Sequence, residues 1–127
     1  MILFITLHLY SFIMKQLIFA VFFLAISFGA LAATYTVINT NDNGAGSLRE
    51  AISSANSAAG ADNIYFSIPT TDPGYDAGSG TFTISLLSAL PMITTGYINI
   101  DATSQQTNQG NTNVHGYEIV LAKGAGT

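Results

Sequence analysis

The chain contains no cysteine and no tryptophan, and only three of its 127 residues are lysine or arginine. Without cysteine there is no disulfide framework, no thiolate zinc site and no thiol nucleophile. The three cationic side chains face seven acidic ones, which gives a net charge of −4. Such a chain lacks the basic surface that binding to a phosphate backbone requires, so we expect no nucleic-acid partner. The length corresponds to one domain or less, since domains usually have about 100–200 residues.

The N-terminal region, 1–33, holds almost all of the long apolar runs. Between Leu17 and Leu31 only Ser27 has a polar side chain, and Lys15 precedes this run. A positive start, a short apolar core and an Ala-x-Ala end are typical of a secretory signal peptide. The core has about 15 residues, whereas a bilayer-spanning helix needs about 20. We therefore predict a signal peptide at residues 14–32, with cleavage after Ala32 or, alternatively, after Ala33.

Residues 1–13 precede the charge with which a signal peptide normally begins. We interpret them as an extension from an upstream start site, which makes Met14 rather than Met1 the true start. The alternative is a longer membrane anchor with Lys15 inside it, but a lysine within a span costs a few kcal/mol. We expect a secreted or cell-surface bacterial protein that meets the membrane only through its export signal.

The 95 residues after position 32 carry nine charges, far below the roughly 25% of ordinary soluble domains. Serine, threonine and asparagine together supply 31 of these residues. Uncharged hydroxyl and amide groups in this proportion suit strand-rich extracellular proteins, in which they form hydrogen-bond ladders on solvent-facing sheet positions.

The region 33–60 is predicted to form a strand, a turn and one helix. A β-branched strand at 34–38 is followed by turn residues at 39–46. Ser47 is a good N-cap, and Glu50 completes a capping box. Gly60 is expected to end the helix in a left-handed conformation. The narrow apolar face requires packing against another element; it consists of Leu48, Ala51, Ile52, Ala55 and Ala59.

The region 61–127 contains four segments in which apolar and polar residues alternate, so each is expected to bury one face. These segments are 64–68, 81–86, 97–101 and 117–121. Their expected buried side chains are Ile64, Phe66 and Ile68, then Phe82, Ile84 and Leu86, then Ile98 and Ile100, then Tyr117, Ile119 and Leu121. No second helix is expected between them.

The spacing of these segments distinguishes two architectures. A β-sandwich places strands every 8–12 residues or so, mostly antiparallel. A β-solenoid repeats one strand per coil at about 20 residues and stacks it parallel on the preceding one. Segment starts 16 to 20 residues apart favour the solenoid. The helix would then cap the apolar end of the first coil.

Two stretches resemble a known family. The sequence TYTV at 34–37 is followed by NDNGAGSLREAI at 41–52. Together they resemble the amino-terminal motif of exported bacterial right-handed parallel β-helix proteins of the pectin-lyase-like type. Some of these carry the signature CSLREA, in which Gly46 here replaces the cysteine. The order of the later segments is also similar, so the resemblance covers residues 34–127; these segments are 61–66, 83–86, 89–94 and 98–101.

The resemblance implies a mainly β protein, a right-handed parallel β-helix whose cap and first coils are present. Family members are large surface or secreted proteins, often with adhesin-like repeats. We therefore expect a fragment whose partner is the downstream coils of the same protein, with carbohydrate or a host surface as a further partner. One alternative is the start of a secreted polysaccharide lyase or glycosidase whose active site lies in later coils. A second is a β-sandwich adhesion module.

No catalytic residue is predicted. We assign structural roles around the cap helix to Ser47, Leu48, Arg49, Glu50, Ile52 and Gly60. Arg49 is a lone cation that would tie the helix to a loop through a carboxylate or backbone carbonyls. Gly44 and Gly46 lack the third glycine of a dinucleotide motif, because Arg49 occupies its place.

No cofactor is expected, although calcium has weak candidate ligands in Asp72 and Asp76. Both lie in a Gly-rich turn and offer hard oxygen donors. The segment lacks the residue order of a known calcium loop, and aspartate is also an ordinary turn residue. His115, in a polar stretch without a histidine or cysteine partner nearby, is expected to be a solvated loop residue.

Overall fold

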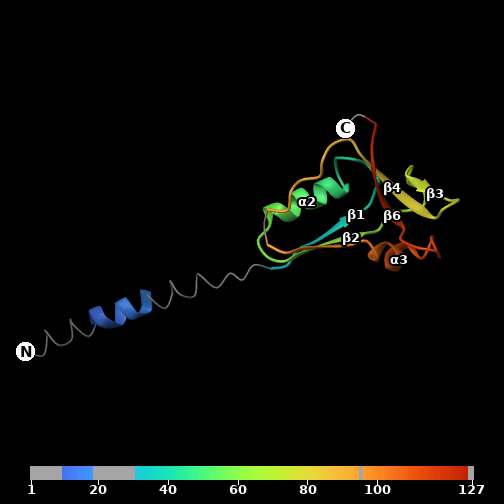
Figure 1. Ribbon diagram of the computed structural model, residues 1–127. Helices are drawn as coiled ribbons and strands as arrows, with labels where there is room; N and C mark the ends of the chain where they lie inside the picture. The colour runs from blue at the N-terminus through green and yellow to red at the C-terminus, as the bar shows by residue number, and fades with distance from the viewer. Residues whose placement is uncertain (1–9, 19–30, 95, 126–127) are drawn as a thin grey trace, which may run out of the picture.

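The computed structural model describes residues 10–18, 31–94 and 96–125. Residues 10–18 are helical and exposed, and most of the predicted apolar core of the signal peptide lies outside the described residues. Within those ranges, no helix combines the length and apolar character needed to cross a bilayer. From residue 31 onward the chain forms a body of short strands and two helices (Figure 1).

Six strands form two three-stranded sheets, in the orders β1-β2-β5 (sheet A) and β3-β4-β6 (sheet B). The elements are β1 Thr34–Val37, α2 Leu48–Ser57, β2 Asp62–Phe66, β3 Tyr75–Asp76, β4 Thr81–Leu86, β5 Ile98–Asp101, α3 Ser104–Gln109 and β6 Ile119–Lys123. All the strands predicted from alternation are present, and so is the predicted short α-helix after the first strand, so the expectation of small sheets with a helix is confirmed.

Sheet A is entirely parallel, and the longer pair of sheet B is parallel as well. Ile64 of β2 pairs with Ile100 of β5, 36 residues later, and Ile84 of β4 pairs with Leu121 of β6, 37 residues later. The expected stacking of each segment directly on its predecessor is therefore wrong. Successive segments alternate between the two sheets, because the loops between them are long enough to carry the chain across.

The core lies between the two sheets. The alternating residues of β2 and β4 point inward, and Ile64, Phe66, Phe82 and Ile84 are fully buried or nearly so. Ile68 continues the buried row beyond the end of β2. The predicted inward faces of these two strands are thus confirmed, and the shared cluster holds sheets A and B together.

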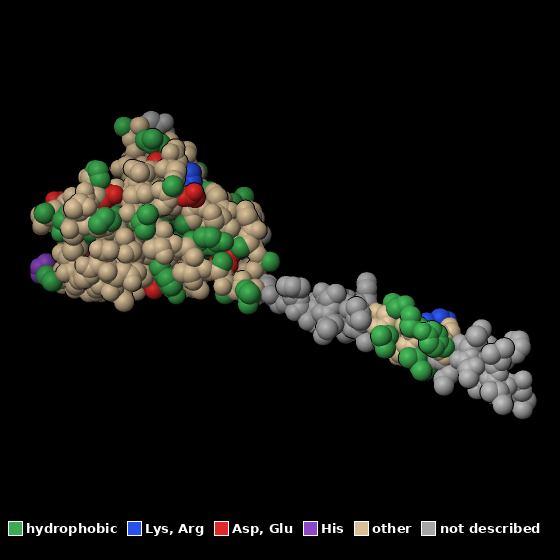
Figure 2. Space-filling model, turned by 180° about the vertical axis from the view of Figure 1, so that it is seen from behind, with side chains coloured by type: hydrophobic (Ala, Val, Ile, Leu, Met, Phe, Trp, Pro, Cys, Tyr) green, Lys and Arg blue, Asp and Glu red, His purple; other side chains and the backbone are tan. Residues whose placement is uncertain are grey.

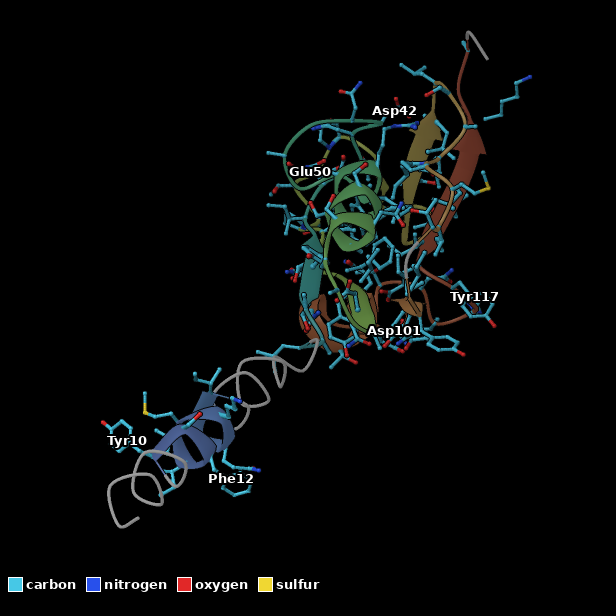
Figure 3. The ribbon with its side chains drawn as sticks, turned by 90° about the vertical axis from the view of Figure 1, so that its left-hand side faces the viewer. Tyr10, Phe12, Asp42, Glu50, Asp101 and Tyr117 are labelled. Atoms are coloured by element: carbon cyan, nitrogen blue, oxygen red, sulfur yellow. The ribbon has the colours of Figure 1, made fainter. Side chains whose placement is uncertain are left out.

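Helix α2 covers one end of this core. It packs against β1 and β2, and Figure 3 shows it between β1 on one side and β4 and β6 on the other. Its buried side chains are Leu48, Ala51, Ile52 and Ala55, and all four belong to the same cluster as the sheet residues. The helix ends earlier than predicted. Ala58 is the C-cap in an extended conformation, which places Ala59 outside the helix.

Gly60 has a positive φ of 124°, but it lies two residues beyond the cap and does not end the helix. Its positive φ is a backbone conformation that favours glycine. The neighbouring chain also needs a glycine, because a Cβ on Gly96 would lie 2.3 Å from the carbonyl oxygen of Gly60. The predicted role of Gly60 is corrected accordingly.

Two elements were not expected. Helix α3 is built from serine, glutamine, threonine and asparagine and has no apolar periodicity that would reveal it. Strand β3 has two residues and pairs antiparallel with β4.

The predicted burial of Tyr117 is wrong. This residue precedes β6 and is 80% exposed, since the strand begins only at Ile119.

Candidate functional site

The N-terminus of α2 is closed by side chains that the sequence assigned to structural roles. Ser47 Oγ accepts a hydrogen bond from the Glu50 amide at 3.2 Å, and Ser47 is fully buried. The Glu50 carboxylate accepts from the Gly46 amide at 2.7 Å. Both interactions satisfy amide groups near the helix start, which have no partner within the helix. Glu50 therefore serves the cap and does not pair with Arg49.

Arg49 fastens the helix to two loops. Its Nε donates to the Asp42 carbonyl at 3.0 Å, and its Nη2 pairs with the Asp42 carboxylate at 2.6 Å. The guanidinium also donates to the carbonyls of Ser88 and Ala89, at 2.9 and 2.5 Å. The fixed fork of the guanidinium suits such convergent acceptors better than an ammonium group would. These bonds join α2 to the loops at Asp42 and at Ser88 and Ala89, so the arrangement is a clamp.

The clamp perturbs the acidity of Asp42. The hydrogen bond from Arg49 lowers the pKa of this carboxyl below its ordinary value, with further help from the Leu87 amide. Desolvation opposes these effects but does not outweigh them. The charged form of Asp42 is thus the form that holds the cap together.

A second contact ties the segment 87–94 to α2. The Asn56 side chain donates to the Met92 carbonyl at 2.8 Å and accepts from the Thr94 amide at 2.9 Å. The amide group thereby pairs with the backbone as a neighbouring strand would. With Arg49, it holds this segment, which we call the strap, along the helix.

The two calcium candidates are engaged in turns. Asp72 accepts from the Thr40 amide and hydroxyl and from the Gly74 amide. Asp76 accepts from the Gly78 amide and the Ser79 hydroxyl, and these bonds, led by that from Ser79, lower the pKa of its carboxyl. In the part of the chain that the structure describes, no three His, Cys, Asp or Glu side chains gather as a metal-binding group.

A partly buried polar cluster on α3 was missed by the sequence analysis. Gln105 is fully buried, and its side-chain amide bonds both backbone groups of Ile68, accepting from the nitrogen at 2.8 Å and donating to the oxygen at 2.7 Å. Ser104 accepts from the Phe66 amide, and Asn108 donates to the Phe66 carbonyl. Beyond the end of β5, side chains of α3 thus make the hydrogen bonds to the backbone of Phe66 and Ile68 that a neighbouring strand would otherwise make.

The end of the body formed by β5 and β6 is incompletely covered. Ile100 pairs in register with Ile64, which is fully buried, yet Ile100 is 42% exposed. Leu121 pairs with the buried Ile84, yet it is 51% exposed. Both strands are edge strands of their sheets. We call this surface of Ile98, Ile100, Ile119 and Leu121 the open end.

On the face in Figure 2, charged side chains are few and scattered among uncharged and hydrophobic ones. His115 lies exposed in a loop, as expected. No protein-family model, curated protein or solved structure matches this chain.

Proposed function

We propose that this chain is a non-catalytic structural module, the cap and first coils of an exported, surface-exposed β-helix protein. The observation that carries the proposal is the pair of parallel registers. Ile64 pairs with Ile100 in sheet A and Ile84 with Leu121 in sheet B, so each turn of the chain contributes one strand to each sheet. A solenoid with two sheets has this relation between its coils.

The cap helix fits the same scheme. In the first coil, β1 contributes to sheet A, and α2 follows it and lies between β1 and the strands of sheet B (Figure 3). Terminal repeats of a solenoid need an element of this kind, because an uncovered coil exposes its apolar interior. The side-chain hydrogen bond between Asn99 and Asn63, at 3.3 Å, is a ladder of the kind that stacked coils support.

The open end supports a proposal for the partner. Further coils with apolar residues stacked on Ile100 and Leu121 would bury these side chains as Ile64 and Ile84 are buried. They would also pair the free edges of β5 and β6, which otherwise invite association with other chains. The proposed partner is therefore a run of downstream coils of the same protein, and the proposed location of the whole is outside the cell. Exposed tyrosines such as Tyr97 offer stacking surfaces for carbohydrate.

Expression in a bacterium with analysis of the exported fraction tests both parts of this proposal. We expect the product to begin at Ala33 or Thr34 by mass spectrometry. We expect it to self-associate with rising concentration, as measured by sedimentation velocity, because copies cover one another's open ends. Ile100→Ser combined with Leu121→Ser should reduce the association.

Val114→Ser is the matched control, since Val114 is 75% exposed in the loop before β6 and is not one of the residues of the open end. It should leave the association unchanged. An uncleaved cytoplasmic product would contradict export. A product that stays monomeric at all concentrations, or a V114S effect equal to that of the double variant, would contradict the role of the open end.

A further inference from the structure

Asp62, the first residue of β2, is a buried acid whose partner lies at the start of the folded body. Its side chain is 2% exposed, and its Oδ1 accepts a hydrogen bond from the backbone nitrogen of Ala33 at 2.8 Å. The other buried acid of the described residues, Glu118, accepts instead from the amides of Thr112 and Asn113 in the loop before it. Asp62 thus holds a residue that is 29 positions away in the sequence.

Ala33 is fixed at both of its backbone groups. Its carbonyl accepts from the Asn63 amide at 2.9 Å, while its nitrogen donates to Asp62. The preceding residue, Ala32, is exposed, and β1 begins at the following one, Thr34. Ala33 is therefore the residue at which the chain joins the body.

The carboxylate of Asp62 has no cationic partner among the side chains of the described residues. The ion pair found there joins Arg49 to Asp42. Aspartate is ordinarily ionised at neutral pH, and a buried carboxylate is costly unless it is both hydrogen-bonded and paired with a positive charge. A cation at the position of the Ala33 nitrogen would meet both conditions.

Cleavage after Ala32 would supply that cation, and the inference rests on the proposed export in this respect. Hydrolysis adds one water across the bond between Ala32 and Ala33. Ala32 leaves with a carboxylate, and Ala33 retains its nitrogen as a primary amine. A free α-amino group has a pKa of about 7.7–8.0, so it takes up a proton at neutral pH and becomes an ammonium. The nitrogen that gains the charge is the atom that contacts Asp62.

We propose that Asp62 is the receptor for the α-ammonium group of the processed chain, so that export creates an ion pair that the precursor lacks. In the precursor the donor is a neutral amide, and charge-assisted hydrogen bonds are shorter and stronger than neutral ones. The pair joins the first residue of the processed chain to β2 and so fastens β1 at the edge of sheet A. Cleavage after Ala33 would remove the donor, so the proposal favours cleavage after Ala32.

Acetylation of the exported product with an amine-reactive reagent at pH 7 tests the pair. The processed chain has two amines, the α-amino group and the exposed Lys123, because Lys15 leaves with the signal peptide. An unpaired α-amino group reacts before a lysine at this pH, since more of it is unprotonated. Pairing with Asp62 should reverse this order in the folded chain. Relative to Lys123, the α-amino group should react at least about tenfold more slowly than it does in urea, as measured by peptide mass spectrometry.

Two variants separate the ion pair from simple shielding of the N-terminus. Asp62→Asn should restore the reactivity of the α-amino group, whereas the control Asp76→Asn, at an exposed acid on β3, should not. Insertion of one serine between Ala32 and Ala33 keeps the bond from the Ala33 amide to Asp62 but moves the α-amino group about 3.8 Å along the chain. This variant should also react at its N-terminus first while giving the far-UV circular dichroism of the folded wild type, so the test does not depend on the folding of D62N.

The outcomes distinguish this inference from the proposed export. A folded product that begins at Ala33 and reacts there before Lys123 would overturn the ion pair and leave export in place. Equal protection in the insertion variant, or a product that begins at Thr34, would overturn it as well. An uncleaved product would contradict export itself and the ion pair with it.

Discussion

Individual side chains replace backbone partners at several points of this molecule. Gln105 and Asn56 each present an amide to two backbone groups, and Arg49 gathers three carbonyls and one carboxylate. The chain has few charged residues, and several of them hold loops or turns in place through hydrogen bonds. Asp42 is the clearest case, because its charged form is stabilised only in the folded clamp.

The lowered pKa of Asp42 predicts an acid-dependent loss of stability. A carboxyl whose pKa is lower in the folded than in the unfolded state contributes fully above its ordinary pKa of about 3.9. The contribution is lost as the pH falls below that value and through the folded one. We expect Asp42→Asn to destabilise the chain at pH 7 and to flatten the decline below pH 4, as measured by urea unfolding at a series of pH values.

Asn43→Ala is a suitable control, because Asn43 is exposed in the same loop. It should keep the pH dependence of the wild type. Parallel declines for D42N and wild type below pH 4 would show that the clamp does not depend on this charge.

At the scale of elements, the sequence predicted which segments form strands but not which strands pair. Alternation identified β2 and β4 and their buried faces, because a half-buried strand imposes a period of two. Pairing depends on where the loops carry the chain, and loop residues such as those at 69–74 have no periodicity that reveals a path. The nearly regular spacing of the segments therefore suggested that β4 stacks on β2, a pairing that does not exist.

Helix α3 was missed for a related reason. Its sequence, SQQTNQ, has no apolar face, and its inward-facing side chains Ser104 and Gln105 are buried through hydrogen bonds. Glu118 escaped notice likewise, since its burial depends on a loop that folds back over it. By contrast, the roles of Ser47 and Arg49 follow from local capping rules and from the scarcity of cations, which a sequence displays directly.

Gln105→Ala tests whether α3 is held by this polar contact. The change would leave the amide and carbonyl of Ile68 buried without partners, at a cost of about 2–4 kcal/mol in the free energy of unfolding. Urea unfolding would measure it. Gln106→Ala, at the next and exposed position, should change stability by less than about 0.5 kcal/mol. Equal effects of the two substitutions would rule out the contact as the anchor of the helix.

At the scale of the whole molecule, the parallel arrangement of the sheets can be tested by cross-linking, because the chain has no native cysteine. Asn63 and Asn99 are register partners, as are Thr83 and Val120. Neighbouring strands lie close enough for disulfides between such partners. We expect each cysteine pair, introduced separately, to form an intramolecular disulfide on mild oxidation, detected by mass spectrometry of peptides.

The control pair is Asn63→Cys with Thr83→Cys. These residues lie on β2 and β4, which belong to different sheets although both strands fall between β1 and β5 in the sequence. It should remain reduced. Ready cross-linking of the control pair, together with failure of both register pairs, would favour an architecture in which successive strands are neighbours.

The long separation between paired strands also has a kinetic consequence. Helix α2 and the short β3–β4 hairpin can form within about 10 μs, since their contacts are local. Sheet A cannot form from local contacts. All of α2 lies between β1 and its partner β2, and the whole β3–β4 hairpin lies between β2 and its partner β5. Each closure loses loop entropy before any contact compensates for it, so contact order predicts slow folding. A chain synthesised from its N-terminus would therefore form and lose its short helix and hairpin many times before the first sheet is complete, because neither is stable until it packs on that sheet.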